Sequence, residues 1–392
     1  MGKDTRVAIA GGGQTRFGER AATWRELVQE AGVAAFSSLS GIGPKDIDGL
    51  FVGAGLPGIL AEQAHVAPLV AEMLGLINIR HMSRVEMACA SGQAALRHAY
   101  MAVASGMCEM ALCVGVEKMC IPDRSRIRKG LAVVLDKEWD AAYGANAPPF
   151  FAMVAQRHMH EFGTTREHLS AVAIKNRGFA ASNPEAHFQD RVTGRDVEES
   201  PTVSPPLRLL DCCPISDGAA AALVVSGDRA RALTDTPVWV RGLGQAARGN
   251  AIAGVGDIIR WDHLRTAVRE ALRMARLGMT DIDMAEVHDC FTISEIIIAE
   301  EFGLCKKGDG GPFVADGGTG LGGALPMNTR GGLLGMGHPL GATGISQTLE
   351  VLHQVRGDVP KERAVGDVGN AIVHNLSGAA NVHSVMVLGR DA

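Results

Sequence analysis

Short apolar runs alternate along this chain with longer segments in which apolar residues recur every third or fourth position. The short runs are typical of buried strands, and the longer segments are typical of helices that bury one face. In the first part of the chain this pattern predicts strands at Arg6–Gly11, Gly49–Gly53 and Met110–Val116, and helices at Trp24–Ser38, Ala61–Leu74 and Ala94–Val103. Such an alternation of strands and helices indicates an α/β fold.

The second part of the chain repeats this order of elements. A helix at Trp261–Leu277 precedes a strand at Met284–Val287, and Asp281-Ile282-Asp283 between them matches Asp46-Ile47-Asp48 of the first part. Further on, a glycine-rich segment opens a helix, and a strand at Val382–Leu388 ends the repeat. Because the matching pieces follow in the same order, we expect a duplicated fold with two α/β halves.

The sequence between the two halves has a different character. It carries charged clusters, two Pro-Pro pairs and a helix around Phe150–Phe162, so we expect an inserted subdomain that covers one face of the halves. The strands Ala219–Val225 and Val238–Leu243 then complete the first half. The predicted division is residues 1–120 with 212–248 for the first half, 121–211 for the insertion and 249–392 for the second half.

Composition and charge exclude several classes of protein. Hydrophobic residues make up 46% and charged residues 21% of the chain, which indicates a globular protein with a large core. A formal net charge of -5 argues against a nucleic-acid-binding surface, and every apolar run is interrupted well short of a membrane span. The cysteines form no C-x-x-C pair, so their spacing does not indicate a zinc site. Without a secretory signal peptide, we expect reduced thiols and a cytoplasmic location.

The first candidate for chemistry is Cys89, at the turn where a predicted helix begins. A helix N-terminus carries unpaired N–H groups and a partial positive charge, which favour the thiolate and lower the pKa of a cysteine. Ala88, Ala90, Ser91 and Gly92 leave room for a ligand to approach the sulfur. The alternative interpretation is a small buried cysteine in a packed strand–helix corner, since free cysteines are often buried.

Three further stretches follow predicted strands, where α/β folds place their ligand sites. They are His288-Asp289-Cys290-Phe291, Gly337-His338-Pro339 and His374-Asn375-Leu376-Ser377-Gly378. Taken singly, each has a structural interpretation, because histidines at strand ends are often packing residues and glycine-rich runs are often turns. His288, Asp289 and Cys290 are also possible metal ligands, but adjacent residues of a strand point to opposite faces, so we expect no metal site.

Together, these stretches resemble the thiolase family. Cys89-Ala90-Ser91 matches its C-x-S nucleophile motif, and Gly337-His338-Pro339 matches its G-H-P motif. His288-Asp289-Cys290-Phe291 and His374-Asn375 match the H-D-C-F and H-N segments of sterol-carrier-protein-2-type and archaeal thiolases. The resemblance covers the whole chain. It implies a thiolase fold, with two βαβαβαββ halves in a five-layered αβαβα core and an inserted loop domain.

The resemblance also assigns a role to each reactive side chain. Cys89 is expected to attack a thioester and carry the acyl group, while His338 takes its proton. Cys290 is expected to move a proton at the α-carbon of a second acyl-CoA. His288, together with His338, would bind the oxygen of the enolate.

The last motif departs from the common thiolase pattern. Asn375 stands where many thiolases carry a second catalytic cysteine, which is why Cys290 is expected to act as the acid and base. The N–H of Cys89 and one from the Ser377–Gly378 turn would bind the thioester oxyanion. Ser377 itself lies near a position where many relatives have glycine.

The implied activity is that of an acyl-CoA C-acyltransferase, which makes or cleaves 3-ketoacyl-CoA such as acetoacetyl-CoA. Coenzyme A thioesters would be its substrates, with no metal or redox cofactor, although the sequence singles out no CoA-contacting residues. The alternatives are a thiolase-fold carbon–carbon lyase or ketoacyl synthase, and a non-catalytic subunit that binds acyl-CoA. The resemblance also implies a homodimer or homotetramer and raises a small zinc-ribbon/OB-fold partner protein.

Overall fold

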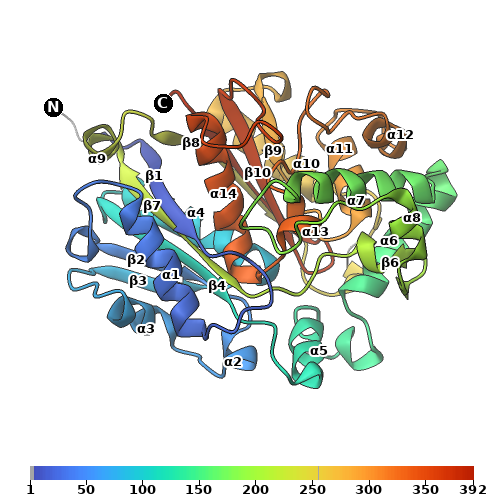
Figure 1. Ribbon diagram of the computed structural model, residues 1–392, viewed down its shortest axis with the longest axis horizontal. Coiled ribbons are helices and arrows are strands. Elements are labelled where there is room, and N and C mark those ends of the chain that lie inside the picture. Colours follow the sequence, from blue (N-terminus) through green and yellow to red (C-terminus); the bar gives the residue numbers. More distant parts are fainter. Residues whose placement is uncertain (1–3, 255) are drawn as a thin grey trace.

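The long strands form one mixed sheet in the computed structural model, which describes residues 4–254 and 256–392 (Figure 1). The strand order across this nine-stranded sheet is β3-β2-β4-β7-β1-β8-β11-β10-β9. Its members are β1 (Val7–Gln14), β2 (Gly49–Gly53), β3 (His81–Val85), β4 (Met110–Glu117), β7 (Gly218–Ser226), β8 (Val238–Ala247), β9 (Met284–Glu286), β10 (Asn370–Ser377) and β11 (Val382–Gly389). Two short strands, β5 (Thr202–Ser204) and β6 (Leu207–Arg208), pair with each other elsewhere.

The sheet consists of two halves with the same arrangement, which confirms the predicted duplication of an α/β unit. In order and direction, β2, β4, β7 and β1 correspond to β9, β10, β11 and β8. The first two strands of each set are parallel, and the later neighbours are antiparallel. The halves meet where Ala8 and Ile9 of β1 pair with Trp239 and Val238 of β8.

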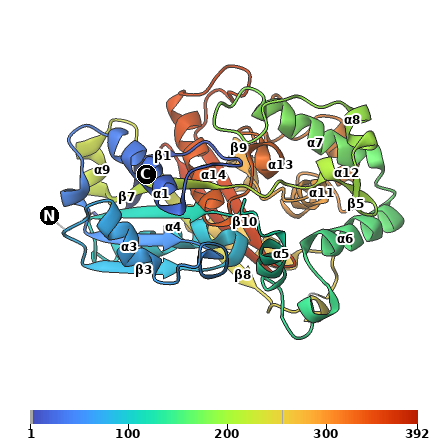
Figure 2. The same ribbon diagram turned by 60° about the horizontal axis from the view of Figure 1, so that its bottom comes forward.

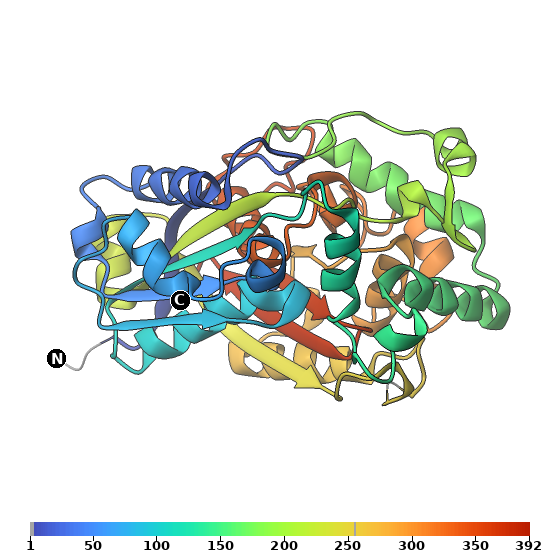
Figure 3. The same ribbon diagram turned by 90° about the horizontal axis from the view of Figure 1, so that it is seen from below.

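Helices lie outside each half of the sheet and between the two halves (Figures 1 and 3). The helices α1 (Trp24–Ser37) and α3 (Val66–Met73) pack on the outer face of the first half, and α10 (Asp262–Ala275) packs on that of the second. Between the halves, α4 (Ser91–Ala104) and α14 (Leu340–Arg356) share an aliphatic core with strands of both. These layers form the five-layered αβαβα arrangement that the family resemblance implied.

Local sequence sets the ends of these helices. At the start of α1 the Thr23 hydroxyl accepts the N–H of Glu26, whose carboxylate accepts the N–H of Thr23 in return. At the end of α14, Gly357 adopts the left-handed conformation with φ of 74°, which a residue with a side chain adopts at a cost.

The two central helices touch each other through glycines. An added Cβ at Gly92 of α4 would lie closer than 3.0 Å to the carbonyl oxygen of Gly341 and 3.3 Å from the nitrogen of Gly344. Likewise, a Cβ at Gly344 would lie 2.6 Å from the nitrogen of Gln93. The absence of side chains at these positions therefore fixes the spacing of α4 and α14. We call this the α4–α14 glycine contact.

The segment between residues 121 and 211 contains the helices α5 (Arg124–Ala132), α6 (Ala147–Phe162), α7 (Arg166–Ala180) and α8 (Gly194–Glu199). Of these, α6 and α7 lie against the second half of the fold, whereas α5 packs on α2 (Pro57–Leu60) of the first half (Figure 2). The helix α7 packs on α11 (Thr292–Glu301), α12 (Gly310–Ala315) and α13 (Gly332–Met336). A further short helix is α9 (Gly227–Leu233). The exact boundaries of the loop domain stay a prediction.

Three predicted elements differ from the structure. We assigned Val238–Leu243 to the first half, but β8 pairs along its length with β11 and is the counterpart of β1. An apolar run identifies a strand without identifying its neighbour. We placed His374-Asn375 after a strand, whereas both lie inside β10, because their polarity masks the apolar run around them. The helix predicted to begin at Ala61 begins at Val66.

Candidate active site

Cys89 lies in a tight turn between β3 and α4, as the sequence pattern predicts. Ala88, just before it, has φ of 44°, a left-handed value that is uncommon for a residue with a side chain. The Ser91 hydroxyl holds this turn together, because it accepts the N–H of Met87 at 2.9 Å and donates to the carbonyl of Ala88 at 2.7 Å. The serine of the Cys-Ala-Ser sequence thus fixes the backbone that presents the sulfur.

The pKa of the Cys89 thiol is shifted in the direction opposite to our prediction. Burial, with a smaller contribution from the carboxylates of Glu117 and Glu86, raises this pKa to about 12, although a backbone N–H acts to lower it. The helix N-terminus therefore does not outweigh the loss of water around the sulfur. The resting residue is a neutral thiol, and its attack on a substrate requires a nearby base.

His338, between α13 and α14, has its ring orientation fixed by a threonine. Its Nδ1 lies 2.7 Å from Oγ1 of Thr343, whose own hydrogen goes to the carbonyl oxygen of Pro339 at 3.0 Å. The hydroxyl must therefore accept a hydrogen bond from Nδ1–H, which leaves the lone pair on Nε2. Among the described residues this Nε2 has no hydrogen-bond partner. Burial lowers the pKa of His338 to about 3, so the ring is neutral, with the Nε2 lone pair free.

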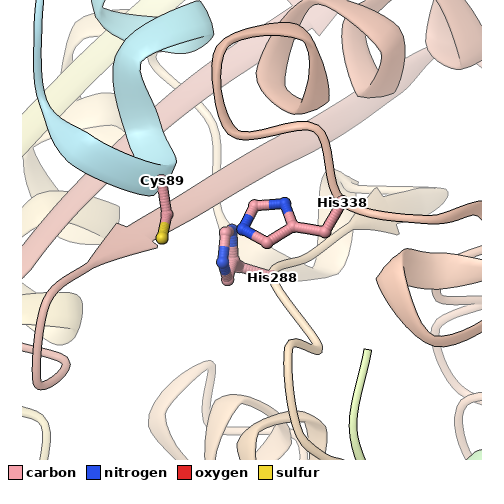
Figure 4. A group of neighbouring side chains, drawn as sticks. All are labelled: Cys89, His288 and His338. Carbon is pink, nitrogen blue, oxygen red and sulfur yellow. The ribbon is translucent and has the colours of Figure 1, made fainter. Parts of the chain in front are cut away.

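His288 follows β9 and stands edge-on to His338. The two ring centroids are 4.8 Å apart, with an angle of 88° between the ring planes. Burial lowers the pKa of His288 well below its ordinary value, and within residues 4–254 and 256–392 neither of its nitrogens has a hydrogen-bond partner. The Cys89 sulfur and one nitrogen from each histidine all lie within 4.8 Å of one another (Figure 4).

A cavity of about 490 Å³ opens beside Cys89 and His338. Cys89, Cys290 and His338 contribute to its wall, together with Cys213 and Gly378. Most of the remaining lining is apolar: Met119, Ile121, Ile127, Leu131, Phe151, Leu209, Leu340 and Leu376. The cavity therefore offers a mainly apolar environment beside the sulfur, although the charged residues Glu19 and Arg124 also line it.

Cys290 is a second thiol at this cavity. Its Sγ lies 3.9 Å from the Ser294 hydroxyl, and its backbone carbonyl accepts the N–H of Cys213 at 2.9 Å. Burial, followed by the proximity of Cys89, raises the pKa of Cys290 well above the ordinary value. Cys290 is thus also a neutral thiol, and it lies close enough to Cys89 for ionisation of one thiol to disfavour ionisation of the other.

The three residues of the last motif occupy different environments. Gly378, with φ of 62°, lies on the cavity wall. Ser377 is buried at the end of β10, opposite Val382 of β11. Asn375 is buried in β10, where its amide donates to the Gln347 side chain and to the carbonyl of His374. Of the three, Gly378 alone is among the residues that line the cavity in the described structure.

Sequence reasoning missed the carboxylate that joins the segments around the site. Glu117 ends β4, is 1% exposed, and accepts the backbone N–H groups of Gly55 at 2.9 Å, Leu56 at 3.0 Å and Gly341 at 3.1 Å. Burial raises its pKa to about 7 despite these hydrogen bonds. Its only signal in the sequence is a single acid directly after a fully apolar strand.

A second missed contact joins the loop domain to the H-D-C-F segment. Asp289 accepts the backbone N–H of Leu333 at 2.7 Å and the side-chain amide of Asn176, from α7, also at 2.7 Å. The same amide donates to Glu295 of α11 at 2.9 Å. These contacts hold the backbone between His288 and Cys290, and they depend on residues too distant in sequence for a local pattern to connect.

In the described part of the chain, none of the helices combines the length and apolar character needed to span a bilayer.

Two protein-family models match this chain. Residues 7–228 match the model described as thiolase, N-terminal domain, and residues 244–390 match the one described as thiolase C-terminal domain-like.

Individual relatives match along the whole chain. It is 43% identical to an acetyl-CoA acetyltransferase of Methanothermobacter thermautotrophicus, over 98% of this chain and 99% of that protein. It is 31% identical to sterol carrier protein 2 of Gallus gallus, over 98% of this chain and 72% of that protein. Among solved structures, the Ltp2-ChsH2(DUF35) aldolase aligns with a TM-score of 0.84 and 31% identity, over 99% of this chain and 98% of that one.

Proposed function

Since this chain belongs to the thiolase family, we propose that it is an acyl-CoA C-acyltransferase that makes or cleaves 3-ketoacyl-CoA. The observation that carries the proposal is the convergence of the Cys89 sulfur with nitrogens of His288 and His338 within 4.8 Å. Its similarity to an acetyl-CoA acetyltransferase makes acetyl-CoA and acetoacetyl-CoA the first substrates to test.

In the first step, the Cys89 sulfur attacks the thioester carbonyl and CoA leaves as a thiol. Because Cys89 is a neutral thiol, a base must take its proton, and the free lone pair of His338 Nε2 suits this task. The N–H of Cys89 and the backbone near Gly378 are our candidates for binding the oxyanion. His338 passes this proton to the leaving CoA sulfur, so the products of the step are CoA as a thiol, a neutral His338 and an acyl group on Cys89.

In the second step the neutral Cys290 thiol first gives its proton to the free Nε2 of His338, and the resulting thiolate takes the α-proton of a second acyl-CoA. The carbanion then attacks the acyl carbon on Cys89. The C–C bond forms as the C–S bond to Cys89 breaks, and the Cys89 sulfur takes up the proton held on Nε2 of His338. Once protonated at Nε2, His338 is a hydrogen-bond donor, and with His288 it would stabilise the enolate oxygen. In the cleavage direction the same groups act in reverse order.

The direct test is incubation with acetyl-CoA followed by peptide mass spectrometry. We expect an acetyl group on the peptide that contains Cys89, and none after Cys89→Ala. Exchange of labelled CoA into acetyl-CoA should occur with the wild-type protein alone. Acetylation of Cys290 with none on Cys89 would overturn the assignment of the nucleophile, and absence of both acetylation and exchange would favour a non-catalytic acyl-CoA-binding subunit.

A carbon–carbon lyase is the second candidate, because the chain is similar to the Ltp2-ChsH2(DUF35) aldolase over its whole length. A retro-aldol cleavage needs no acyl group on a cysteine. The two candidates are therefore distinguished by Cys89→Ala, which would abolish acyl transfer but leave an aldolase active towards a 3-hydroxyacyl thioester.

We also propose that the protein forms at least a homodimer. The strand β3 lies at one edge of the sheet, and Met82 within it is 45% exposed, so the edge is suited to pairing with a second chain. Light scattering should give a mass of at least twice the 41.1 kDa of one chain. A zinc-ribbon/OB-fold partner, which would extend this assembly, can be sought by co-purification from the native host.

A further inference from the structure

The nucleophile and both histidines of the candidate site also have the composition of a metal-binding site. They offer one thiol sulfur and two imidazoles, and their ligand atoms lie within 4.8 Å of one another. Thiolate and imidazole are the ligands that Zn²⁺ prefers in proteins. The three residues come from distant segments, so no spacing motif in the sequence indicates them.

Within the described structure, histidine nitrogens of this group are free to bind a metal ion. Among the described residues, both nitrogens of His288 and Nε2 of His338 are buried and lack hydrogen-bond partners. A buried polar atom without a partner is unfavourable, so a group that binds there gains stability. His338 is already held through Nδ1 by Thr343, the kind of outer contact that orients a metal-binding histidine and leaves Nε2 to the ion.

To bind one ion, the three ligand atoms must move closer together. With Zn–S near 2.3 Å and Zn–N near 2.0–2.1 Å, the ligand atoms of a tetrahedral site lie about 3.3–3.6 Å apart. Starting from distances of up to 4.8 Å, the ligand atoms must approach one another by up to about 1.5 Å. Cys89 and His338 also line the cavity, so the fourth position of the ion would face the space where substrate enters.

We propose that Cys89, His288 and His338 form an inhibitory site for Zn²⁺ and chemically similar divalent cations. On binding, the Cys89 S–H bond breaks, a Zn–S bond forms and one proton is released to water. The bound ion removes the nucleophile and both histidine lone pairs from the reaction, and a chelator reverses the effect. Binding itself depends on these side chains and not on the proposed acyl transfer.

The test uses Co²⁺ as a spectroscopic probe on the chelator-treated, full-length protein. We expect one ion per chain, visible bands typical of tetrahedral cobalt, and a sulfur-to-cobalt charge-transfer band. Cys89→Ser should remove the charge-transfer band, and His288→Ala should remove the tetrahedral bands. Cys120→Ser is the matched control, since Cys120 lines the same cavity but lies outside the three-residue group.

Binding and inhibition are measured separately. Zn²⁺ should displace Co²⁺, raise the melting temperature of the wild-type protein but not of Cys89→Ala, and inhibit CoA exchange until EDTA is added. A charge-transfer band that survives Cys89→Ser, or that is lost in Cys290→Ser instead, would overturn the ligand set. Because the cobalt spectrum needs no turnover, it decides the metal site even if the proposed acyl transfer fails.

Discussion

Replacing Gly92 by alanine should disable the site without touching a reactive side chain. Gly92 lies three residues after Cys89, and its added Cβ would lie closer than 3.0 Å to the carbonyl oxygen of Gly341, three residues after His338. Neither backbone can rotate out of the way, so α4 and α14 must move apart. Overpacking of this kind costs about 1–3 kcal/mol, against a gain in helix propensity of up to about 1 kcal/mol.

The effect on activity should be larger than the effect on stability. Since the two helices begin beside Cys89 and His338, their separation increases the distance between sulfur and base, and a misplacement of about 1 Å can cost about a hundredfold in rate. We expect kcat/KM for acetoacetyl-CoA synthesis to fall by about that factor, with only a small decrease in the urea midpoint.

Gly58 provides the matched control. It lies in the short helix α2, and no described atom lies within 4 Å of a Cβ added there. Gly58→Ala should leave activity unchanged, with stability unchanged or slightly increased. If Gly92→Ala were as active as Gly58→Ala, the α4–α14 glycine contact would not control the geometry of the site.

Further predictions concern single side chains. Cys290→Ala should keep Cys89 acetylation but slow α-proton exchange by about a hundredfold or more, and exchange of deuterium into acetyl-CoA at the wild-type rate would identify another base. Thr343→Val should lower kcat by about ten- to a hundredfold by freeing the His338 ring, with activity retained in Thr343→Ser. Glu117 has its pKa raised to about 7 in the folded state, so the stability it confers is present below its ordinary pKa of 4.5 and is lost as pH rises through 7. Between pH 5 and pH 8 the wild-type unfolding free energy should therefore fall by about 2–3 kcal/mol more than that of Glu117→Gln, and equal pH profiles in urea titrations would contradict this.

The parts of this fold that the sequence predicts are those set by local pattern. Strand β2 and helix α1 follow from the spacing of apolar residues, and the position of Cys89 follows from the small residues before a helix. The partner of β8 could not be predicted, because a buried strand presents the same pattern to any neighbour.

The features of the site that depend on distant segments could not be predicted from the sequence either. Our prediction of a lowered pKa for Cys89 was wrong. The pKa depends on the burial of the sulfur beneath distant segments rather than on the helix that begins beside it. The convergence of Cys89 with His288 and His338 depends on how the two halves are placed against each other. Glycines such as Gly92 and Gly341 decide that placement, yet in the sequence they look like ordinary turn or helix residues.

The duplicated topology has a consequence for how such a site can arise. The sulfur stands at the start of the central helix of one half, and the base stands at the start of the equivalent helix of the other. Two identical chains associated about a two-fold axis would bring two copies of the same residue to this junction. A thiol opposite an imidazole therefore requires that the twofold symmetry be broken, and joining both copies in one polypeptide lets each copy diverge separately.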